Sequence, residues 1–161
     1  LIDSFCLFWL SFIDGKKTND RHYWQNSQNS PALDSWRGLA FENLCFSHSD
    51  CIRQALGIGG VNTEVSTWLY DGDDEHKGAQ IDMVLTRADN IINLCEMKFS
   101  KNEFSINKEY DKRIRERTET FREVEKTRKV IHNTLITTYG LKRNAYSDQF
   151  QSVVTASQLM V

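Results

Sequence analysis

Two short apolar segments, each interrupted by charge, constrain the fold of this chain most. GAQIDMVLTRA (residues 78–88) contains Asp82, and IINLCEMKFS (residues 91–100) contains Glu96 and Lys98. Both segments have the length and the aliphatic content of β-strands. Side chains alternate across a strand, so Glu96 and Lys98 point to the same side. One side of the second strand is therefore reserved for charge.

The other elements are predicted from hydrophobic periodicity and turn residues. Apolar residues recur at steps of three and four after Asp34 or Ser35, which predicts a helix that ends at Gly57. The DGDDEH and ADN segments are typical of turns between antiparallel strands. We expect a second long helix that Asn107 opens, and further strands at residues 61–70, 133–140 and 151–160. This order predicts an α/β fold with a central mixed β-sheet flanked by helices.

The first 34 residues differ from the rest. LIDSFCLFWLSFI predicts an aromatic-rich helix that is too short to span a membrane. The polar stretch from Asp14 to Asp34 contains the only proline and predicts a linker. We therefore expect residues 1–34 to be a helical segment and linker from an upstream domain, and residues 35–161 to be the main domain. The aromatic segment is expected to contact that upstream domain or a second copy of the chain as a homodimer.

Composition and charge narrow the function classes. The 161 residues are 40% apolar, which is enough for a compact core. The net charge of −2 excludes a protein whose whole surface is basic. Residues 1–97 carry seven Lys or Arg against 14 Asp or Glu, whereas residues 98–161 carry 13 against eight, which predicts a local cationic face. The four cysteines form no CxxC pair, so a cytoplasmic location with reduced thiols is expected.

The charged strands predict a reaction chemistry. Burying one ion alone is costly, so the site must be open, internally paired or organised around a cation. If Asp82 converges on Glu96, the two carboxylates are ligands that Mg²⁺ or Mn²⁺ accepts, with Lys98 beside the ion. Such a group suits phosphodiester hydrolysis, in which a divalent cation activates water and neutralises phosphate oxygens. A glycosidase also uses two carboxylates, but its chemistry has no use for the lysine.

The spacing of these residues resembles a known family. Asp82, thirteen intervening residues and then Glu96-Met97-Lys98, on strands that follow a helix, resemble the PD-(D/E)xK nuclease superfamily from about Trp36 to Val161. The segments GAQIDMVLTRADNIINLCEMKFS and TTYGLKRNAYSDQFQSVVT look closest to the C-terminal nuclease-like domain of bacterial P-loop AAA-family ATPases. The resemblance implies a restriction-endonuclease-like fold, a DNA substrate and an ATPase domain in the same full-length chain.

The resemblance also implies roles for individual residues. Asp82 and Glu96 would be metal ligands, and Lys98 would be the catalytic lysine. Glu42, in GLAFENL on the first helix, matches the additional helical carboxylate of the superfamily and would be a further ligand. The sequence departs from the pattern at Ala79-Gln80-Ile81, which stands where the eponymous proline is found.

Less specific interpretations stay open at this point. Asp82, Glu96 and Lys98 would also suit an exposed ion-pair ladder at a sheet edge. The same residues would suit a catalytically inactive module that binds nucleic acid or docks to the ATPase. Gln80 would either hydrogen-bond the site or be exposed, and Glu64 would either add a carboxylate or lie apart. Cys45, His48 and Cys51 recur every three residues, which a helix face explains better than a metal site without a fourth ligand.

Basic residues after Lys98 are candidates for contacts to a nucleic-acid backbone. The helix after Asn107 mixes both signs with pairs at i,i+4, which is typical of a solvated face. Its basic residues, Lys108 and Arg117 among them, nevertheless follow the strand of Lys98 closely in the sequence, so this helix is expected to flank the cleft. The candidates are Lys101, Lys112, Arg113, Lys142 and Arg143. The sequence contains no GxxxxGK[ST] motif, so ATP binding through a P-loop is not expected of this chain.

Overall fold

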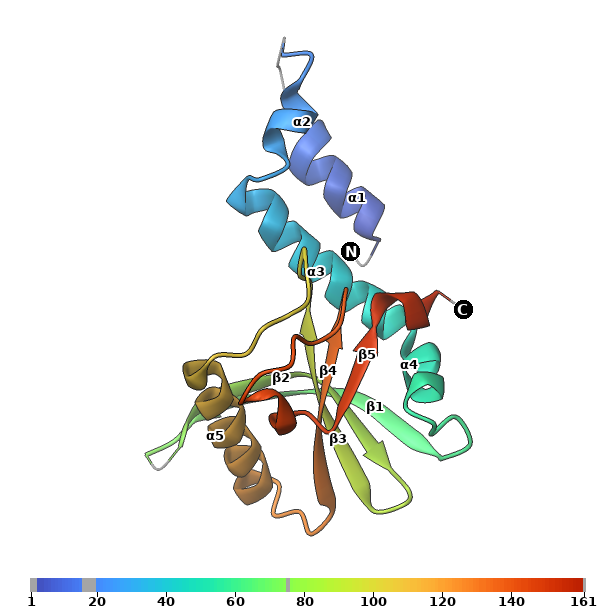
Figure 1. The fold of residues 1–161 in the computed structure, drawn as a ribbon, viewed down its shortest axis with the longest axis vertical. Helices are drawn as coiled ribbons and strands as arrows, with labels where there is room; N and C mark the ends of the chain where they lie inside the picture. The colour runs from blue at the N-terminus through green and yellow to red at the C-terminus, as the bar shows by residue number, and fades with distance from the viewer. Residues whose placement is uncertain (1–2, 16–19, 75, 161) are drawn as a thin grey trace.

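A five-stranded β-sheet forms the centre of the molecule (Figure 1). The computed structural model describes residues 3–15, 20–74 and 76–160. β1, β2 and β3 pair antiparallel, whereas β3, β4 and β5 pair parallel. The strands lie side by side in chain order: β1 (Thr63–Gly72), β2 (Lys77–Arg87), β3 (Ile91–Lys98), β4 (Val130–Thr137) and β5 (Ser152–Thr155). The predicted mixed sheet is confirmed.

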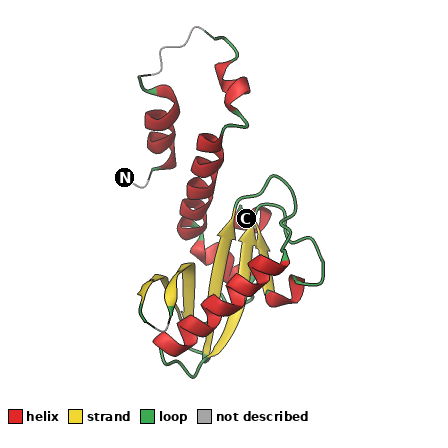
Figure 2. Cartoon of the chain, turned by 90° about the vertical axis from the view of Figure 1, so that its left-hand side faces the viewer, coloured by secondary structure: helices red, strands yellow, loops and turns green. Residues whose placement is uncertain are grey.

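Helices cover both faces of this sheet (Figure 2). α3 (Pro31–Ser47) and α4 (Ser49–Ala55) pack against one face. α5 (Lys108–Val124) packs against the other face and connects β3 to β4, because parallel neighbours need a long crossover. Asn107 caps α5 as predicted, and its Oδ1 accepts a hydrogen bond from the Tyr110 N–H at 2.8 Å. The predicted α/β class is confirmed.

α3 begins earlier than the N-cap predicted at Asp34 or Ser35. Its N-cap is Ser30, whose hydroxyl oxygen accepts a hydrogen bond from the Leu33 N–H at 3.3 Å. Pro31 occupies the first turn, where its fixed φ favours a helix and its missing N–H costs nothing. The proline therefore starts a helix here, although in the sequence it indicated a linker.

The strands expected over residues 61–70 and 133–140 lie within three residues of those bounds, and two other predicted boundaries are wrong. The helix expected to run to Gly57 divides at His48, whose backbone is not helical and whose Nδ1 donates to the Leu44 carbonyl at 2.9 Å. The last strand, expected over residues 151–160, ends at Thr155 because a 3₁₀ turn, η3 (Ala156–Leu159), follows. Neither change moves the charged segments out of the sheet.

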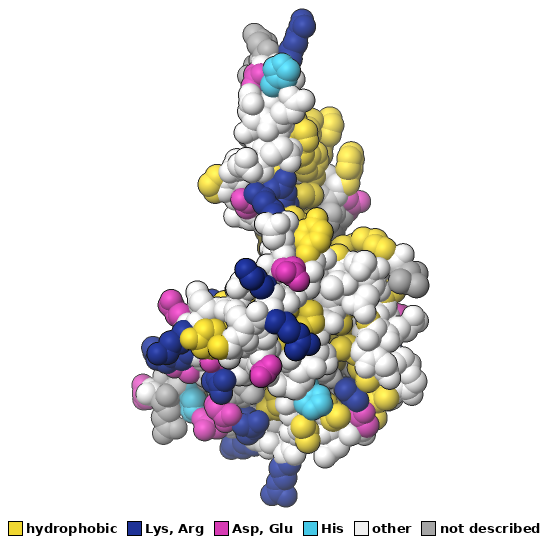
Figure 3. All heavy atoms as spheres, in the orientation of Figure 1, with side chains coloured by type: hydrophobic (Ala, Val, Ile, Leu, Met, Phe, Trp, Pro, Cys, Tyr) yellow, Lys and Arg dark blue, Asp and Glu magenta, His cyan; other side chains and the backbone are white. Residues whose placement is uncertain are grey.

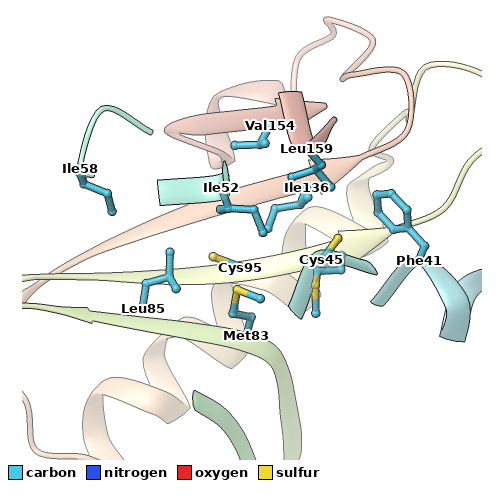
Figure 4. Close-up of a cluster of buried hydrophobic side chains, with 11 residues drawn as sticks. Phe41, Cys45, Ile52, Ile58, Met83, Leu85, Cys95, Ile136, Val154 and Leu159 are labelled. Atoms are coloured by element: carbon cyan, nitrogen blue, oxygen red, sulfur yellow. The ribbon is translucent and has the colours of Figure 1, made fainter. Parts of the chain in front are cut away.

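The apolar side chains of β2 and β3 divide between two cores. Figure 4 shows Met83 and Leu85 of β2 and Cys95 of β3 facing Cys45 of α3 and Ile52 of α4. On the opposite face, the residues that surround Phe121 of α5 are Ile81 and Val84 of β2 and Ile92 and Leu94 of β3. Burial on both faces explains why these strands read as nearly continuous apolar runs.

A β-bulge in β2 interrupts this alternation at Asp82. Ser66 of β1 pairs with Val84, but Trp68 pairs with Ile81, so β2 holds one residue more than β1 over this interval. Ile81 and Val84 therefore pack into the same core although three positions separate them. Regular pairing of β2 with β3 stops nearby, and Asp82 Oδ2 accepts a hydrogen bond from the Met97 N–H at 2.9 Å. Bulges commonly redirect a side chain in this way.

The N-terminal helices project from the body along α3 (Figure 1). They are α1 (Ser4–Phe8), a π-helical turn η1 (Trp9–Ile13) and α2 (Tyr23–Ser27). Phe8 and Phe12 contact the rings of Trp24 and Trp36, with centroid distances of 5.1–6.3 Å. The aromatic helix is confirmed over its described residues, whereas Leu1 and Ile2 lie outside them. The predicted linker contains α2, and α3 runs through the predicted domain boundary.

Hydrophobic side chains gather on the outside of this projection (Figure 3). Phe5 is 70% exposed, and Trp9 and Leu10 are about half exposed, at 48% and 57%. In the described ranges, no helix combines the length and the apolar character needed to cross a membrane.

Candidate functional site

Asp82, Glu96 and Lys98 meet in one cleft. The Lys98 ammonium lies 3.0 Å from Glu96 Oε1 and 3.8 Å from Asp82 Oδ2, so it stands between the two carboxylates. The cleft has a volume of about 500 Å³, and its other walls come from the start of β2 and from α5. The bulge and the Met97 N–H fix the Asp82 carboxylate on this side. The sequence prediction that these three residues converge agrees with this geometry.

Glu42 of α3 lines the same cleft. It is half-buried, and within the described parts of the chain it makes no hydrogen bond or ion pair. Burial raises the pKa of Glu42, and repulsion from Asp82 and Glu96 adds to this, while the Lys98 charge opposes it. The fourth predicted residue therefore lies within electrostatic reach of the other three.

Glu96 is the most deeply held group of the site. Its side chain is 3% exposed and binds the Tyr110 hydroxyl and the Arg117 guanidinium in addition to Lys98. Burial alone would raise the pKa of Glu96, but the Arg117 and Lys98 charges and the Tyr110 hydrogen bond outweigh it. They lower that pKa from 4.5 to about 2. Glu96 is therefore ionised across the physiological range.

Asp82 lies in a different electrostatic environment. Burial raises its pKa, and the nearby Glu96 charge raises it further, although the Met97 N–H and the Lys98 charge act in the opposite direction. The negative charges of Asp82 and Glu42 are thus only partly compensated by the nearby Lys98 ammonium. A cation between them would relieve that repulsion.

The donor chemistry fits a divalent cation. Mg²⁺ is usually held by one or two carboxylates, with water and substrate oxygens completing its shell, and Asp82 and Glu42 supply such oxygens. Among the described residues, no three acidic, histidine or cysteine side chains are already gathered closely enough to enclose a metal ion. Glu96 would join as a third protein ligand only by sharing an oxygen that Arg117, Tyr110 or Lys98 now occupies.

Two residues of α5 belong to the site but were not among the predicted site residues. Arg117 was expected only as one of the cations that follow the lysine strand, and Tyr110 had no predicted role in the site. Tyr110, Arg113 and Arg117 are spaced i, i+3 and i+7, which places them on one helix face. Arg113 stacks on the Tyr110 ring, 4.4 Å from its centroid, and its Nη2 lies 4.0 Å from Glu96 Oε1. That spacing is the signal from which the sequence could have revealed them.

Only one of the residues predicted to contact a nucleic-acid backbone lines the cleft. Arg113 lines the cleft, and Lys112 lies beside it on α5, 3.6 Å from Glu116. Lys101 pairs instead with Asp34 of α3 at 3.2 Å. Lys142 and Arg143 follow β4 and are not part of the cleft lining, whereas Lys77, which sequence reasoning missed, is.

Gln80 and Glu64, whose positions the sequence left open, lie in different places. Gln80 lines the cleft, and its backbone carbonyl accepts a hydrogen bond from Arg117 at 3.2 Å. Glu64 is exposed on β1 and lines a different depression together with Thr86 and Lys129. Glu64 adds no carboxylate to the site.

Comparisons with known proteins leave the family open. No family model matches the sequence, and no curated protein matches it. One solved structure with a similar course of the chain is the crystal structure of AF1548, a protein of unknown function. The TM-score is 0.44 at 19% identity, over 69% of this chain and 56% of that one, so the chain spans little more than half of that protein. A likeness of this degree does not inform the function.

Proposed function

We propose that this chain is a restriction-endonuclease-like domain that hydrolyses phosphodiester bonds in DNA with Mg²⁺ or Mn²⁺. The observation that carries the proposal is the convergence of Asp82, Glu96 and Lys98 from two strands, with Glu42 from a helix, in one cleft. The chain uses a bulge and a buried hydrogen-bond network to hold these groups, whereas a simple edge ladder of ion pairs would need neither.

Each residue has a role in this proposal. Asp82 and Glu42 would hold the cation, and Glu96 would join them as a third ligand. When bound, the divalent cation supplies an activated water and neutralises phosphate oxygens. Lys98, about one-third exposed, directs its ammonium toward the cleft between the carboxylates, where it orients the attacking water or stabilises developing charge on the phosphate. Tyr110 fixes the Glu96 carboxylate that positions Lys98.

The wider context is part of the same proposal. The resemblance of the two quoted segments to ATPase-linked domains supports attachment to a P-loop ATPase in the full-length protein. Basic and acidic side chains alternate over α5 and the neighbouring hairpin (Figure 3). Such a surface supports contacts to the nucleic-acid backbone at a few separate points. It does not suit binding of nucleic acid by one continuous basic face.

A second candidate is a non-catalytic module that binds nucleic acid or docks the ATPase. One observation favours it: Glu96 already has Arg117, Lys98 and Tyr110 as partners. A carboxylate that is neutralised by internal cations has less need of a metal ion.

Plasmid cleavage in Mn²⁺ tests the first candidate. We expect the chain to cut, and Asp82→Ala and Lys98→Ala to reduce the rate about 10²–10³-fold, as loss of a group that stabilises the transition state does. Glu64→Gln is the matched control, because Glu64 is exposed and lies outside the cleft. Cleavage that survives Asp82→Ala or Lys98→Ala would reject the assignment. Salt-sensitive DNA retention without cleavage, unchanged in Glu96→Ala, would favour the second candidate.

A further inference from the structure

Arg117 is buried more deeply than a surface cation of α5 should be. Its side chain is 10% exposed and lines the cleft beside Lys98. One terminal nitrogen, Nη1, donates to Glu96 Oε2 and to the Gln80 carbonyl. That nitrogen therefore links α5 both to Glu96 of β3 and to the backbone of β2.

The rest of the guanidinium has no partner. Nε and Nη2 are both buried, and neither has a hydrogen-bond acceptor among the described residues. These two N–H groups lie on the same edge of the planar guanidinium and point in parallel, which is the geometry that binds two oxygens of one anion. Buried donors are normally satisfied, so a pair of unsatisfied donors on a residue that lines a cleft indicates a missing acceptor.

We propose that the Nε and Nη2 edge of Arg117 binds a phosphate group of the nucleic-acid backbone. The inference rests on the proposed function for the identity of the substrate. A phosphodiester has two non-bridging oxygens, which match two parallel donors. The phosphate held there lies beside the carboxylates and Lys98, so Arg117 sets which phosphate of the strand meets the reactive groups.

The surrounding charges are consistent with an anion at this point. Lys77, Lys98 and Arg113 line the same cleft and add positive charge to that of Arg117, which together offset the four carboxylates of the lining, Glu42, Asp82, Glu96 and Glu116. Binding at this edge leaves Nη1 with Glu96, so no existing ion pair has to break. Nε and Nη2 are shielded from solvent, so a phosphate reaches them only when the lining of the cleft opens locally.

The first test observes Arg117 directly in the wild-type chain. The side-chain Nε–H signal is assigned in isotope-labelled wild type, by correlating it through the side-chain carbons with the backbone of Arg117. In EDTA, inorganic phosphate and a short DNA duplex should each move this signal in a saturable manner, whereas sodium chloride of equal ionic strength should not. A signal that neither probe moves would overturn the proposal. A signal that phosphate moves and DNA does not would overturn the nucleic-acid assignment.

The second test measures DNA affinity in EDTA. Arg117→Lys keeps the charge but loses the paired donors, and it should weaken duplex binding about tenfold. Arg122→Lys is the control, because Arg122 lies on the same helix and pairs with Glu119 outside the cleft. Equal affinity of wild type and a folded Arg117→Lys would overturn the proposal. If that variant fails to fold, the wild-type spectra decide.

The two proposals fail separately. An Arg117 signal that responds to DNA in a chain that never cleaves with Mn²⁺ overturns the nuclease and supports the phosphate site. Cleavage that depends on Asp82, without any response of the Arg117 signal, supports the nuclease and overturns the phosphate site.

Discussion

Glu96 is a buried carboxylate and Asp82 a partly buried one, and the two differ in the charges around them. Burial raises the pKa of each, but only Glu96 has a guanidinium, an ammonium and a phenol hydroxyl as direct partners. Sequence alternation predicted that Glu96 and Lys98 share a side. It gave no role in the site to Tyr110 or Arg117, because they belong to α5, a helix that follows β3 in the chain and packs on this face of the sheet.

Tyr110→Phe tests the hold on Glu96. The substitution removes a hydrogen bond to a charged group and should lower the free energy of unfolding by about 1.5–3 kcal/mol at neutral pH, as measured in urea. The pKa of Glu96 is depressed on folding, so its contribution is present above its ordinary pKa of 4.5 and is lost as the pH falls toward about 2. The variant should therefore unfold in acid at a higher pH.

The control for this prediction is Tyr139→Phe, because Tyr139 is 61% exposed. Equal urea and acid midpoints for Tyr110→Phe and wild type would show that the hydroxyl contributes nothing to the state of Glu96.

At the level of elements, two side-chain contacts join the hairpin of β1 and β2 to the C-terminal end of α5, in addition to the hydrogen bond from Arg117 to the Gln80 carbonyl. His76 Nε2 lies 2.5 Å from Glu123 Oε2, and Trp68 Nε1 donates to Glu125 Oε1 at 2.8 Å. His76 directly precedes Lys77, the first residue of β2 and part of the cleft lining. The distance between the hairpin and α5 therefore sets the width of the site.

The His76 contact predicts a pH-dependent hairpin. Hydrogen bonding to Glu123 raises the pKa of His76, and Asp73 adds to the effect. Because the folded pKa exceeds the ordinary value of 6.5, the stabilisation is present below that value and is lost as the pH rises through the folded pKa. Amide exchange in β1 and β2, corrected for its intrinsic pH dependence, should therefore accelerate above neutral pH.

In His76→Gln this additional pH dependence should disappear, while His22→Gln on α2 should keep it. Wild-type and His76→Gln hairpins that exchange alike at every pH would contradict the prediction.

Element type was predictable here, but element ends and the bulge were not. β2, β3 and α5 could be predicted because their apolar periodicity is long and uninterrupted by proline. The start of α3 was missed since Pro31 favours a first helical turn as well as a linker. The extra residue of β2 leaves no mark in the sequence, because Ile81, Met83 and Val84 are equally apolar in either register. The spacing of the residues thus indicated that Asp82 and Glu96 meet, but it did not reveal the bulge that turns Asp82 toward the cleft.

At the scale of the whole molecule, the chain has a sheet-centred body and an aromatic projection carried by α3 (Figure 1). Phe12 is 7% exposed and is in ring contact with Phe8, Trp24 and Trp36, so it anchors the projection. The body has its own cores, none of which includes these rings. The two parts should therefore respond separately to mutation.

Phe12→Ala should release the projection while the body stays folded. Loss of a buried phenylalanine typically costs about 3–5 kcal/mol, which exceeds what so small a cluster supplies. Limited proteolysis should cleave the segment on the N-terminal side of Pro31 many times faster in Phe12→Ala than in wild type. Phe5→Ala, at an exposed position, should behave as wild type. Intact protection in Phe12→Ala, or simultaneous loss of the sheet, would contradict this separation.

The single additional residue in β2 has a consequence for how the chain tolerates change. Ile81 and Val84 stay in one core and Asp82 stays at the cleft only while the count between them is kept. Exchanging one aliphatic residue for another alters volume, but deleting one would realign the strand and carry the acid away from its partners. Relatives that share this chemistry should vary freely in composition along β2 and hardly at all in its length.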